Sequence, residues 1–298
     1  VTFKNGLCSI KITENGGRFV RKKSETAEEN QEFLKKYDDS EYVKPSVTTD
    51  IVVFGMFDME ENNYRKNSDK ILKILLVKRK EEPYKNCYAL PGGFVRPNET
   101  LVQAAARELK EETNLPCDFL EQFGTYSTPG RDPRGWIISN GFMALLDASQ
   151  YHVQGGSDAE EAKWFEILFR EEDGIWTLCL KNGNDIVHAV VKDTTGKWDI
   201  KRKFVSVDSD EIAFDHEIII ADAVTQLRKW ITDTHIAFRL LPEKFTLREL
   251  QQIHETVLDT SLFAAGFRRK IAAHVEETGE MTGDAGHRPA MLYREREL

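Results

Sequence analysis

The sequence lacks the features that mark several common classes of protein. No apolar run approaches the length of about 20 residues that crosses a membrane, and residues 1–30 contain no apolar segment typical of a secretory leader. The four cysteines show no CxxC spacing, and the seven histidines show no zinc spacing. Neither a Walker loop nor a GxSxG elbow occurs. These absences argue against a membrane or zinc protein and favour a cytoplasmic protein with free thiols.

The composition has an acidic surplus. The chain of 298 residues has a formal net charge of −9 and is 40% hydrophobic. This length allows a sizeable core and predicts two domains rather than one. The net charge argues against a protein generally coated with nucleic acid. Binding depends on where the charge lies, however, so a local basic patch stays open.

The first segment, residues 1–45, has the pattern of an N-terminal extension. The run ENGG at residues 14–17 predicts the turn of a short hairpin. The stretch SETAEENQEFLKKY predicts a helix, in which Thr26 and Glu29 have the spacing of a capping box.

Residues 46–236 show strands around two strong helices. Strands are expected in SVTTDIVVFGMF, ILKILLVKRK, NCYALPGGFV, FLEQFGTYSTPGRD, WIISNGFMALLD and KWFEI, and helices over 100–113 and 215–231. This order predicts an α/β or α+β domain. Residues 168–210 interrupt the pattern with an Asn-Gly turn between two strand-like runs and with a third such run, KRKFVSV. We interpret them as a β insertion.

Residues 237–298 have a different pattern, that of a winged helix-turn-helix. A helix over 245–258 begins with a capping box formed by Thr246 and Glu249. A second helix follows in SLFAAGFRRKIAAHV, where Phe263, Phe267 and Ile271 are four residues apart and are expected to line one face. Two short strands around a Gly-rich turn complete the wing.

The stretch GGFVRPNETLVQAAARELKEETNL, residues 92–115, carries the strongest chemical signal. Glu108 and Glu112 share one face of the expected helix, with Glu111 beside them. Like charges at this spacing destabilise a helix, and a divalent cation removes that penalty. Magnesium prefers oxygen ligands and often binds a few carboxylates together with substrate phosphates.

The residues around the glutamates fit such a site. Gly92 and Gly93 allow the backbone to approach a metal or a diphosphate closely. Arg107 and Glu99 are expected to pair and to pin the preceding loop to the helix. Asn114 lies where the helix should end, and Asn tolerates the left-handed conformation required there. A solvated acidic helix explains the glutamates alone, but not this ordered set.

The stretch resembles the Nudix signature. The matching positions are Gly93, Glu99, Arg107-Glu108-Leu109, Glu111-Glu112 and Leu115, and Asn114 replaces the final glycine. Asn is the next-best residue for that backbone geometry, so we do not interpret the replacement as inactivation. The resemblance implies an α+β fold, a Nudix α/β/α sandwich with a mixed sheet, and covers roughly residues 46–235.

The resemblance also implies an activity, the hydrolysis of a nucleoside diphosphate linked to another group, with Mg²⁺ or Mn²⁺ as cofactor. Metal ions neutralise the phosphates and activate a water for attack on phosphorus. Glu108, Glu112 and the carbonyl of Gly93 are the implied metal ligands, and Glu111 and Arg107 belong to the implied catalytic group. Gly92 is assigned to substrate binding.

Two loops supply further candidates. In relatives that cleave ADP-ribose a loop glutamate acts as the base, and Glu160 or Glu161 lies at the corresponding place; the alternative is a solvated loop. Arg131 and Arg134, in the loop RDPRG, suit phosphate recognition, with a surface turn as the alternative. His216 follows Asp215, which we interpret as the N-cap of a helix rather than as part of a catalytic pair.

The whole of residues 42–298, apart from the insertion, resembles the Nudix-related transcriptional regulators of NAD metabolism. The segments that carry this resemblance are RDPRGW, EAKWF, FDHEIIIADAVTQLR, LLPEKFTLRELQQIHETVLD, FRRKI and GHRPAMLY. It implies a Nudix domain that binds ADP-ribose or a related nucleotide, and a winged helix that binds double-stranded operator DNA as a homodimer.

Basic side chains beside the expected recognition helix support DNA binding. The candidates are Arg268, Arg269, Lys270 and Arg288, with Arg294 beside the wing. Residues 239–298 nevertheless contain nine Lys and Arg against ten Asp and Glu. A winged helix used for dimerisation or protein contact therefore stays open.

Two functional hypotheses follow. The first is a magnesium-dependent hydrolase, acting on ADP-ribose to give AMP and ribose 5-phosphate, fused to a DNA-binding winged helix. The alternative is a transcriptional regulator that senses ADP-ribose or a nucleotide sugar, with weak or no hydrolysis. The two are compatible, because a hydrolase can consume its own effector.

Overall fold

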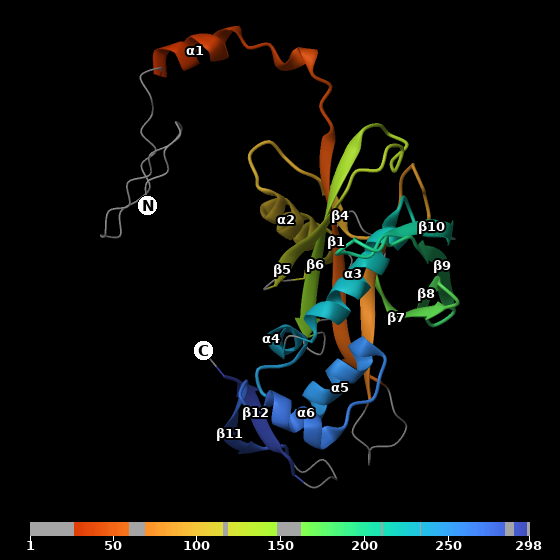
Figure 1. Cartoon of the computed structure of the whole chain (residues 1–298), viewed down its shortest axis with the longest axis vertical. Helices are drawn as coiled ribbons and strands as arrows, with labels where there is room; N and C mark the ends of the chain where they lie inside the picture. The colour runs from red at the N-terminus through yellow and green to blue at the C-terminus, as the bar shows by residue number, and fades with distance from the viewer. Residues whose placement is uncertain are drawn as a thin grey trace. The chain divides into compact units, whose positions relative to one another are not determined.

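The structure is a computed structural model that describes residues 27–59, 69–115, 119–147, 162–209, 211–232, 234–283 and 289–296. The chain divides into two units, Val1–Lys44 and Pro45–Leu298. The first unit contains the predicted helix as α1 (Ala27–Lys36), followed by a short 3-10 helix, Asp39–Glu41 (Figure 1). The predicted hairpin at 14–17 and the capping residue Thr26 lie outside the described residues.

The second unit is built on one large mixed sheet, in the order β10-β9-β8-β7-β2-β1-β6-β5, with β3 paired to β2 and β4 to β1. The strands are β1 (Ser46–Asp58), β2 (Lys70–Lys78), β3 (Tyr88–Ala89), β4 (Gly92–Phe94), β5 (Leu120–Tyr126), β6 (Ile137–Asp147), β7 (Ala162–Glu172), β8 (Ile175–Asn182), β9 (Asp185–Asp193) and β10 (Phe204–Ser209). Strands β1 and β6 run parallel, and the other pairs are antiparallel. The predicted mixed sheet is therefore confirmed.

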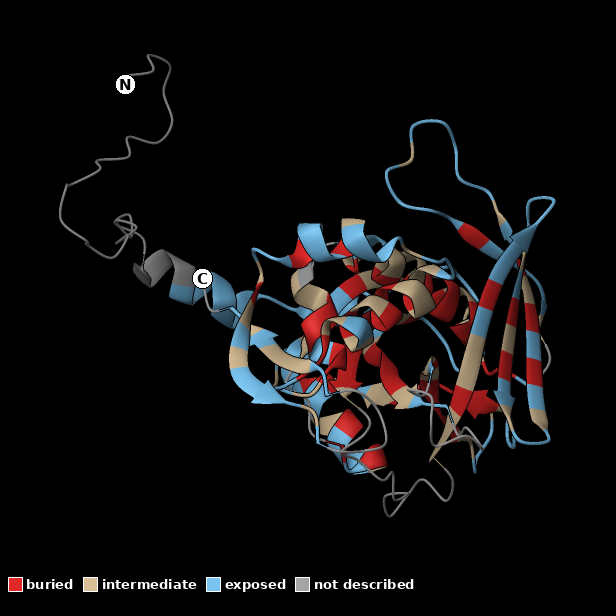
Figure 2. Cartoon of the chain, turned by 90° about the horizontal axis from the view of Figure 1, so that it is seen from below, coloured by how far each residue is buried: buried red, intermediate tan, exposed pale blue. Residues whose placement is uncertain are grey.

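Helices cover both faces of this sheet, because its central strand is apolar on both sides. In β1, Ile51 and Val53 pack with one face of α2 (Leu101–Thr113), whereas Val52 and Phe54 belong to the larger core under α3 (His216–Trp230). Figure 2 shows the buried residues along the strands and on the inward sides of the helices. The predicted α/β/α sandwich is confirmed.

The predicted β insertion is an extension of the same sheet. Strands β7 to β10 form a consecutive antiparallel meander that continues outward from β2. The expected hairpin is present: Asn182 pairs with Asp185, and Gly183 adopts a positive φ of 57° in the two-residue turn. One face of the meander contributes Phe169, Leu178 and Val191 to the core under α3.

The C-terminal part has the predicted winged helix-turn-helix order. Its elements are α4 (Thr234–Ala237), a 3-10 helix (Phe238–Leu240), α5 (Leu247–Leu258), α6 (Ala264–Ile271), β11 (Val275–Met281) and β12 (Met291–Glu295). The capping box of Thr246 and Glu249 is formed in α5. Strands β11 and β12 pair antiparallel as the wing.

One expectation about this domain was wrong. Phe267 and Ile271 are buried as predicted, but the side chain of Phe263 is 82% exposed. Phe263 occupies the N-cap position of α6, with an extended backbone, so the helical repeat does not extend back to it. Within the described ranges, no helix is long and apolar enough to cross a membrane.

Candidate functional site

The Nudix-like helix α2 is fixed at both ends by its own sequence. Thr100 and Gln103 form a capping box at its start. Asn114 ends it in the left-handed conformation, with φ 56° and ψ 15°, as predicted. Ala105 and Leu109 are fully buried against the sheet. Glu108 and Glu112 lie on the adjoining side of the helix, where they meet the glycine turn.

The two glycines before α2 are required by close contacts. Gly92 has a φ of 155°, and a Cβ at this position would lie 2.0 Å from the carbonyl oxygen of Thr49. A Cβ on Gly93 would lie 2.6 Å from a carboxylate oxygen of Glu108. The Gly92 N–H donates a hydrogen bond of 3.0 Å to Glu112 Oε2. The turn therefore lies directly against the carboxylates of the helix.

Arg107 holds the acidic side chains together. It donates to both carboxylate oxygens of Glu99, at 3.0 and 2.6 Å, and to Glu108 Oε1 at 2.6 Å and Glu111 Oε2 at 3.1 Å. It also donates to the carbonyl oxygen of Phe94, which follows the glycine turn. The predicted pair with Glu99 is thus confirmed, and Arg107 holds the pKa of Glu99 down at about 2. Arg107 positions the loop and the helix relative to each other.

Glu112 is the electrostatically unfavourable member of the site. Burial, assisted by the nearby carboxylates of Glu108 and Asp50, raises its pKa to about 8, although the Gly92 N–H and Arg79 act to lower it. An ionised Glu112 would thus add buried negative charge that the site's own cations do not fully neutralise. Such a set of carboxylate oxygens fits a divalent cation.

The carboxylates are engaged with the protein itself in this arrangement. Glu108 accepts from Arg107, and Glu112 accepts from Gly92. Among the residues that the structure describes, no three His, Cys, Asp or Glu side chains converge as a metal site. The metal roles of Glu108, Glu112 and the Gly93 carbonyl therefore stay predictions.

A cleft of about 500 Å³ opens beside Glu112. Gly92 and Glu112 line one part of it, and Lys78, Arg79 and Lys80, at the end of β2, line another. A cleft with cations facing a metal-compatible carboxylate suits a phosphate-containing ligand. The sequence analysis missed these three residues, although the run KRK directly after the apolar ILLV of β2 was a usable signal.

Arg134 lies near the same cleft. Its guanidinium is 5.2 Å from the ring centroids of Phe94 and Phe214, and Arg79 lies 4.9 Å from the Phe214 ring. The positive charge of Arg134 lowers the pKa of Arg79, an effect second only to burial. Asp132 accepts hydrogen bonds from Arg134 and orients it. Two neighbouring guanidinium groups make an anion favourable here.

Arg131, predicted with Arg134 to bind substrate, lies instead in a buried ion pair. Its side chain is 4% exposed and donates to both carboxylate oxygens of Asp215, at 2.9 and 2.5 Å. Asp50 lies 3.6 Å away on the other side. Asp215 is the N-cap residue of α3, as predicted, but it forms no capping hydrogen bond, because Arg131 engages its carboxylate.

His216 is a connecting residue that the sequence analysis assigned only to a helix start. It is buried, and its Nδ1 accepts the Leu90 N–H at 3.0 Å. The proton of the neutral ring therefore lies on Nε2, which faces Asp50 Oδ1 at 3.6 Å. Burial lowers the pKa of His216, so the ring is neutral at pH 7. His216 thereby joins the start of α3 to the backbone just before the glycine turn.

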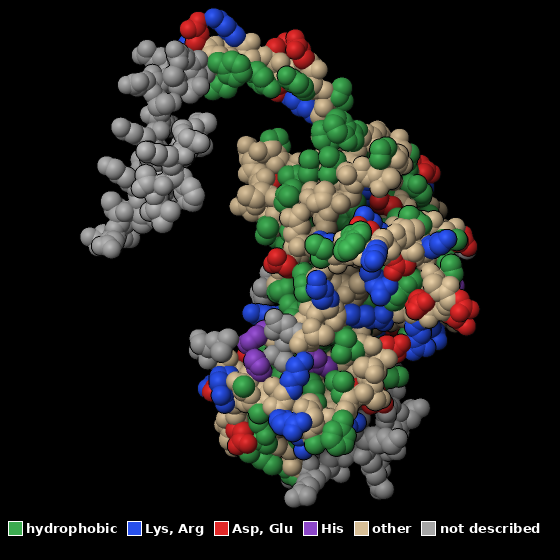
Figure 3. Space-filling model, in the orientation of Figure 1, with side chains coloured by type: hydrophobic (Ala, Val, Ile, Leu, Met, Phe, Trp, Pro, Cys, Tyr) green, Lys and Arg blue, Asp and Glu red, His purple; other side chains and the backbone are tan. Residues whose placement is uncertain are grey.

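The remaining predicted residues lie elsewhere or outside the described ranges. Glu160, Glu161 and Arg288 are outside them. Arg268, Arg269 and Lys270 are exposed on α6, and Figure 3 shows Lys and Arg side chains over this part of the winged helix. Lys270 also donates to the Thr232 carbonyl at 3.2 Å, and Arg294 pairs with Glu276.

Comparison with protein families assigns both halves of the chain. Residues 51–174 match the NUDIX domain, and residues 237–294 match the NrtR DNA-binding winged helix domain. The chain is 30% identical over 267 residues to the "ADPR responsive transcriptional repressor NtrR" of Acinetobacter baylyi, covering 89% of this chain and 87% of that protein.

Of two further similarities, the first concerns part of the chain and the second concerns most of it. The "ADP-ribose pyrophosphatase" of Methanocaldococcus jannaschii is 42% identical over 134 residues, which cover 45% of this chain and 68% of that protein. The crystal structure of Shewanella oneidensis NrtR complexed with a 27mer DNA has a TM-score of 0.53 at 26% identity, covering 84% of this chain and 93% of that one.

The raised pKa of Glu112 predicts a pH-dependent stability. Its pKa is about 8 in the folded chain against a usual value of 4.5, so the folded state loses stability as the pH rises from about 4.5 to about 8. Glu112→Gln cannot ionise and still accepts the Gly92 N–H. We expect this variant to unfold at a higher temperature than the wild type at pH 9, by roughly 2–4 °C. The difference should vanish near pH 5.

The matched control is Glu121→Gln, which removes an exposed carboxylate on β5. Its Tm should follow that of the wild type at both pH values. Differential scanning calorimetry of the three proteins measures this. A Glu112→Gln difference that is the same at pH 5 and pH 9 would contradict the burial of an ionisable carboxylate.

Proposed function

Because this chain belongs to the family of Nudix proteins with an NrtR winged helix domain, we propose that it is a transcriptional repressor that ADP-ribose releases from DNA. The observation that carries the proposal is structural. Strand β2 ends at the cationic cleft, and α3 begins at His216, which contacts the cleft-lining Leu90; both elements also contact α5 of the winged helix. The cleft, at about 500 Å³, has the size of a small-ligand site.

The cleft offers chemistry suited to a diphosphate. Lys78, Arg79 and Lys80 line the cleft at the end of β2, and the guanidinium of Arg134, paired with Asp132, lies next to Arg79. Guanidinium groups bind phosphate oxygens by paired hydrogen bonds. Opposite them, the carboxylate of Glu112 selects for a ligand that arrives with a divalent cation.

Helix α3 forms the first connection between the cleft and the winged helix. At its start, His216 accepts the Leu90 N–H beside the glycine turn. Near its end, Arg228 donates to the Phe169 carbonyl of the sheet at 2.8 Å and to the Val257 carbonyl of α5 at 3.2 Å. A displacement of α3 at the cleft is therefore transmitted to the last turn of α5.

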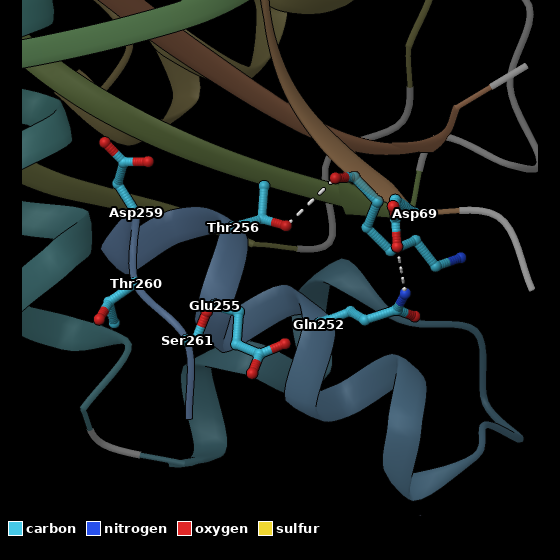
Figure 4. Close-up of a pocket in the computed structure, with 8 residues that line it drawn as sticks. Asp69, Gln252, Glu255, Thr256, Asp259, Thr260 and Ser261 are labelled. Atoms are coloured by element: carbon cyan, nitrogen blue, oxygen red, sulfur yellow. Dashed lines mark hydrogen bonds between the residues drawn. The ribbon is translucent and has the colours of Figure 1, made fainter. Parts of the chain in front are cut away.

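Strand β2 forms the second connection. Its first residue, Lys70, pairs with Asp58 at 2.8 Å and lies 3.8 Å from Glu249 of α5. Thr256 donates to the Lys70 carbonyl at 3.2 Å, and Gln252 donates to the carboxylate of Asp69, also at 3.2 Å. Both bonds are drawn in Figure 4. The other end of the same strand leads into the cations of the cleft. Both connections therefore meet at α5.

The proposal predicts binding of DNA that ADP-ribose weakens. The full chain should bind a fragment from upstream of its own gene more tightly than random DNA, with an affinity that falls as salt rises. ADP-ribose with Mg²⁺ should reduce this affinity by about tenfold or more. Fluorescence anisotropy at two salt concentrations measures both effects, with AMP as the control ligand. Binding no tighter than to random DNA, unchanged by ADP-ribose, would sink the proposal.

The connection through α3 predicts an uncoupled variant. Arg228→Ala leaves the carbonyl oxygens of Phe169 and Val257 without this donor, and costs about 1–3 kcal/mol of stability. Below its unfolding temperature it should still bind ADP-ribose and DNA separately. The effect of ADP-ribose on DNA affinity should fall to less than about threefold, which corresponds to loss of most of the coupling free energy.

Arg170→Ala is the control for this variant. Arg170 pairs with Asp259 at the same junction, but both side chains are well exposed, and such pairs contribute little. Its coupling should remain near the wild-type value. If Arg228→Ala bound both ligands normally and showed the same coupling as the wild type, the proposed connection through α3 would be contradicted.

Hydrolysis of ADP-ribose is the second candidate function. The set of Glu108, Glu111 and Glu112 is complete, Arg107 and the glycine turn hold it in place, and an ADP-ribose pyrophosphatase is 42% identical over this half. A bound Mg²⁺ or Mn²⁺ would supply charge neutralisation and a nucleophilic water. The carboxylates of Glu108 and Glu112 are the groups that would hold it. Glu160 and Glu161 are the proposed alternatives for the general base.

This activity predicts that AMP forms from ADP-ribose in the presence of Mg²⁺. Glu112→Gln should slow the reaction by about 100-fold or more, since the site loses a charged ligand. Glu121→Gln should leave it unchanged. Comparing Glu160→Gln with Glu161→Gln identifies the base, and chromatography of the nucleotides measures each rate. Intact binding of ADP-ribose without any AMP would contradict hydrolysis and leave the repressor proposal standing.

A further inference from the structure

Phe263 occupies a position that stability alone does not explain. It is the N-cap residue of α6, where Ser, Thr, Asp or Asn would accept a hydrogen bond from the helix, and it makes no such bond. Its side chain is also 82% exposed, although large apolar side chains are usually buried. Neither feature stabilises the folded chain, and the exposed ring is available for a contact outside it.

The backbone around Phe263 is held in a defined place. Glu255 of α5 accepts the Leu262 N–H at 2.7 Å, and Gln251 donates to the Leu262 carbonyl at 3.0 Å, so the preceding residue is fixed on both sides. The Phe263 carbonyl accepts the first bond of α6, from the Phe267 N–H at 3.0 Å. The ring lies beside Gly266, 3.7 Å from where a Cβ on that residue would stand.

The exposed side of α6 changes character along its length. Beside Phe263, the first turn exposes Ala264 and Ala265, which offer no side-chain hydrogen bond. The last turn exposes Arg268 and Arg269, which suit phosphate contacts. A recognition helix directs its N-terminal residues at base edges, and the thymine methyl is the apolar group that the major groove presents.

We propose that Phe263 reads thymine methyl groups in the major groove, while Arg268 and Arg269 hold the flanking phosphates. This inference rests on the proposed DNA binding of the winged helix. It assigns sequence preference to an apolar contact at the start of α6 and affinity to the cations at its end. The charge on the same exposed side favours DNA over a protein partner as the occupant.

The test removes the methyl group from the DNA. The full chain is used to select binding duplexes from a random pool, and each thymine of the selected site is replaced by uracil, which lacks only the C5 methyl. For the wild type, at least one replacement should weaken binding by roughly fourfold, the factor expected for one buried methyl group. For Phe263→Ala, the same replacement should change binding by less than 1.5-fold, a threshold of about the precision of such titrations.

Two further variants keep the test decisive. Phe263→Leu retains an apolar side chain and should keep part of the uracil effect if the alanine variant binds too weakly to measure. Trp198→Ala removes an equally exposed aromatic from the loop between β9 and β10, and should keep the full effect. Circular dichroism confirms that each variant is folded.

The outcomes separate this inference from the proposed function. Specific binding with no uracil effect, or with the same effect in Phe263→Ala, would overturn the role of Phe263 and leave DNA binding intact. A change of oligomeric state in Phe263→Ala, with DNA preference unchanged, would assign the ring to a protein contact instead. A chain that selects no DNA sequence at all would count against the proposed function itself.

Discussion

The site depends on a carboxylate that the fold buries without a full counter-charge. Glu112 lies beneath the glycine turn, near Glu108 and Asp50, and its pKa is raised to about 8. Gly92 donates an N–H to it, and Arg107 binds Glu108 together with Glu99 and Glu111. The folded chain alone does not provide the remaining positive charge, so a cation-carrying ligand gains binding free energy by supplying it.

The sequence predicted those parts of the site that local geometry determines. The pairing of Arg107 with Glu99 and the left-handed Asn114 follow from helix spacing and capping within one short segment. The contact of His216 with Leu90 joins residues 126 positions apart, and no local pattern reports it. Arg131 was likewise predicted to bind phosphate, because the sequence does not show that its partner in the fold is the distant Asp215.

The differences in the fold have a similar origin. Residues 168–210 interrupted the expected alternation, yet they extend the sheet, because a strand pattern does not specify which neighbour it pairs with. Phe263 was placed on the buried face by extending a helical repeat across the N-cap, where the backbone is not helical. Periodicity therefore misplaces residues at the boundaries of helices, and Phe263, at such a boundary, is the residue proposed to contact DNA.

The two proposed functions, sensing and hydrolysis, place different demands on the same cleft. A ligand shifts the DNA-binding equilibrium only through a difference in its affinity for the two states. In the proposed complex, the diphosphate of ADP-ribose suits the cations of Arg79 and Arg134. A divalent cation bound with that diphosphate suits the carboxylate of Glu112. The proposed cleavage would divide this ligand into two monophosphates, AMP and ribose 5-phosphate. On the proposed function, slow hydrolysis would thus end the signal without any change in the DNA, and its rate would set how long the operator stays free.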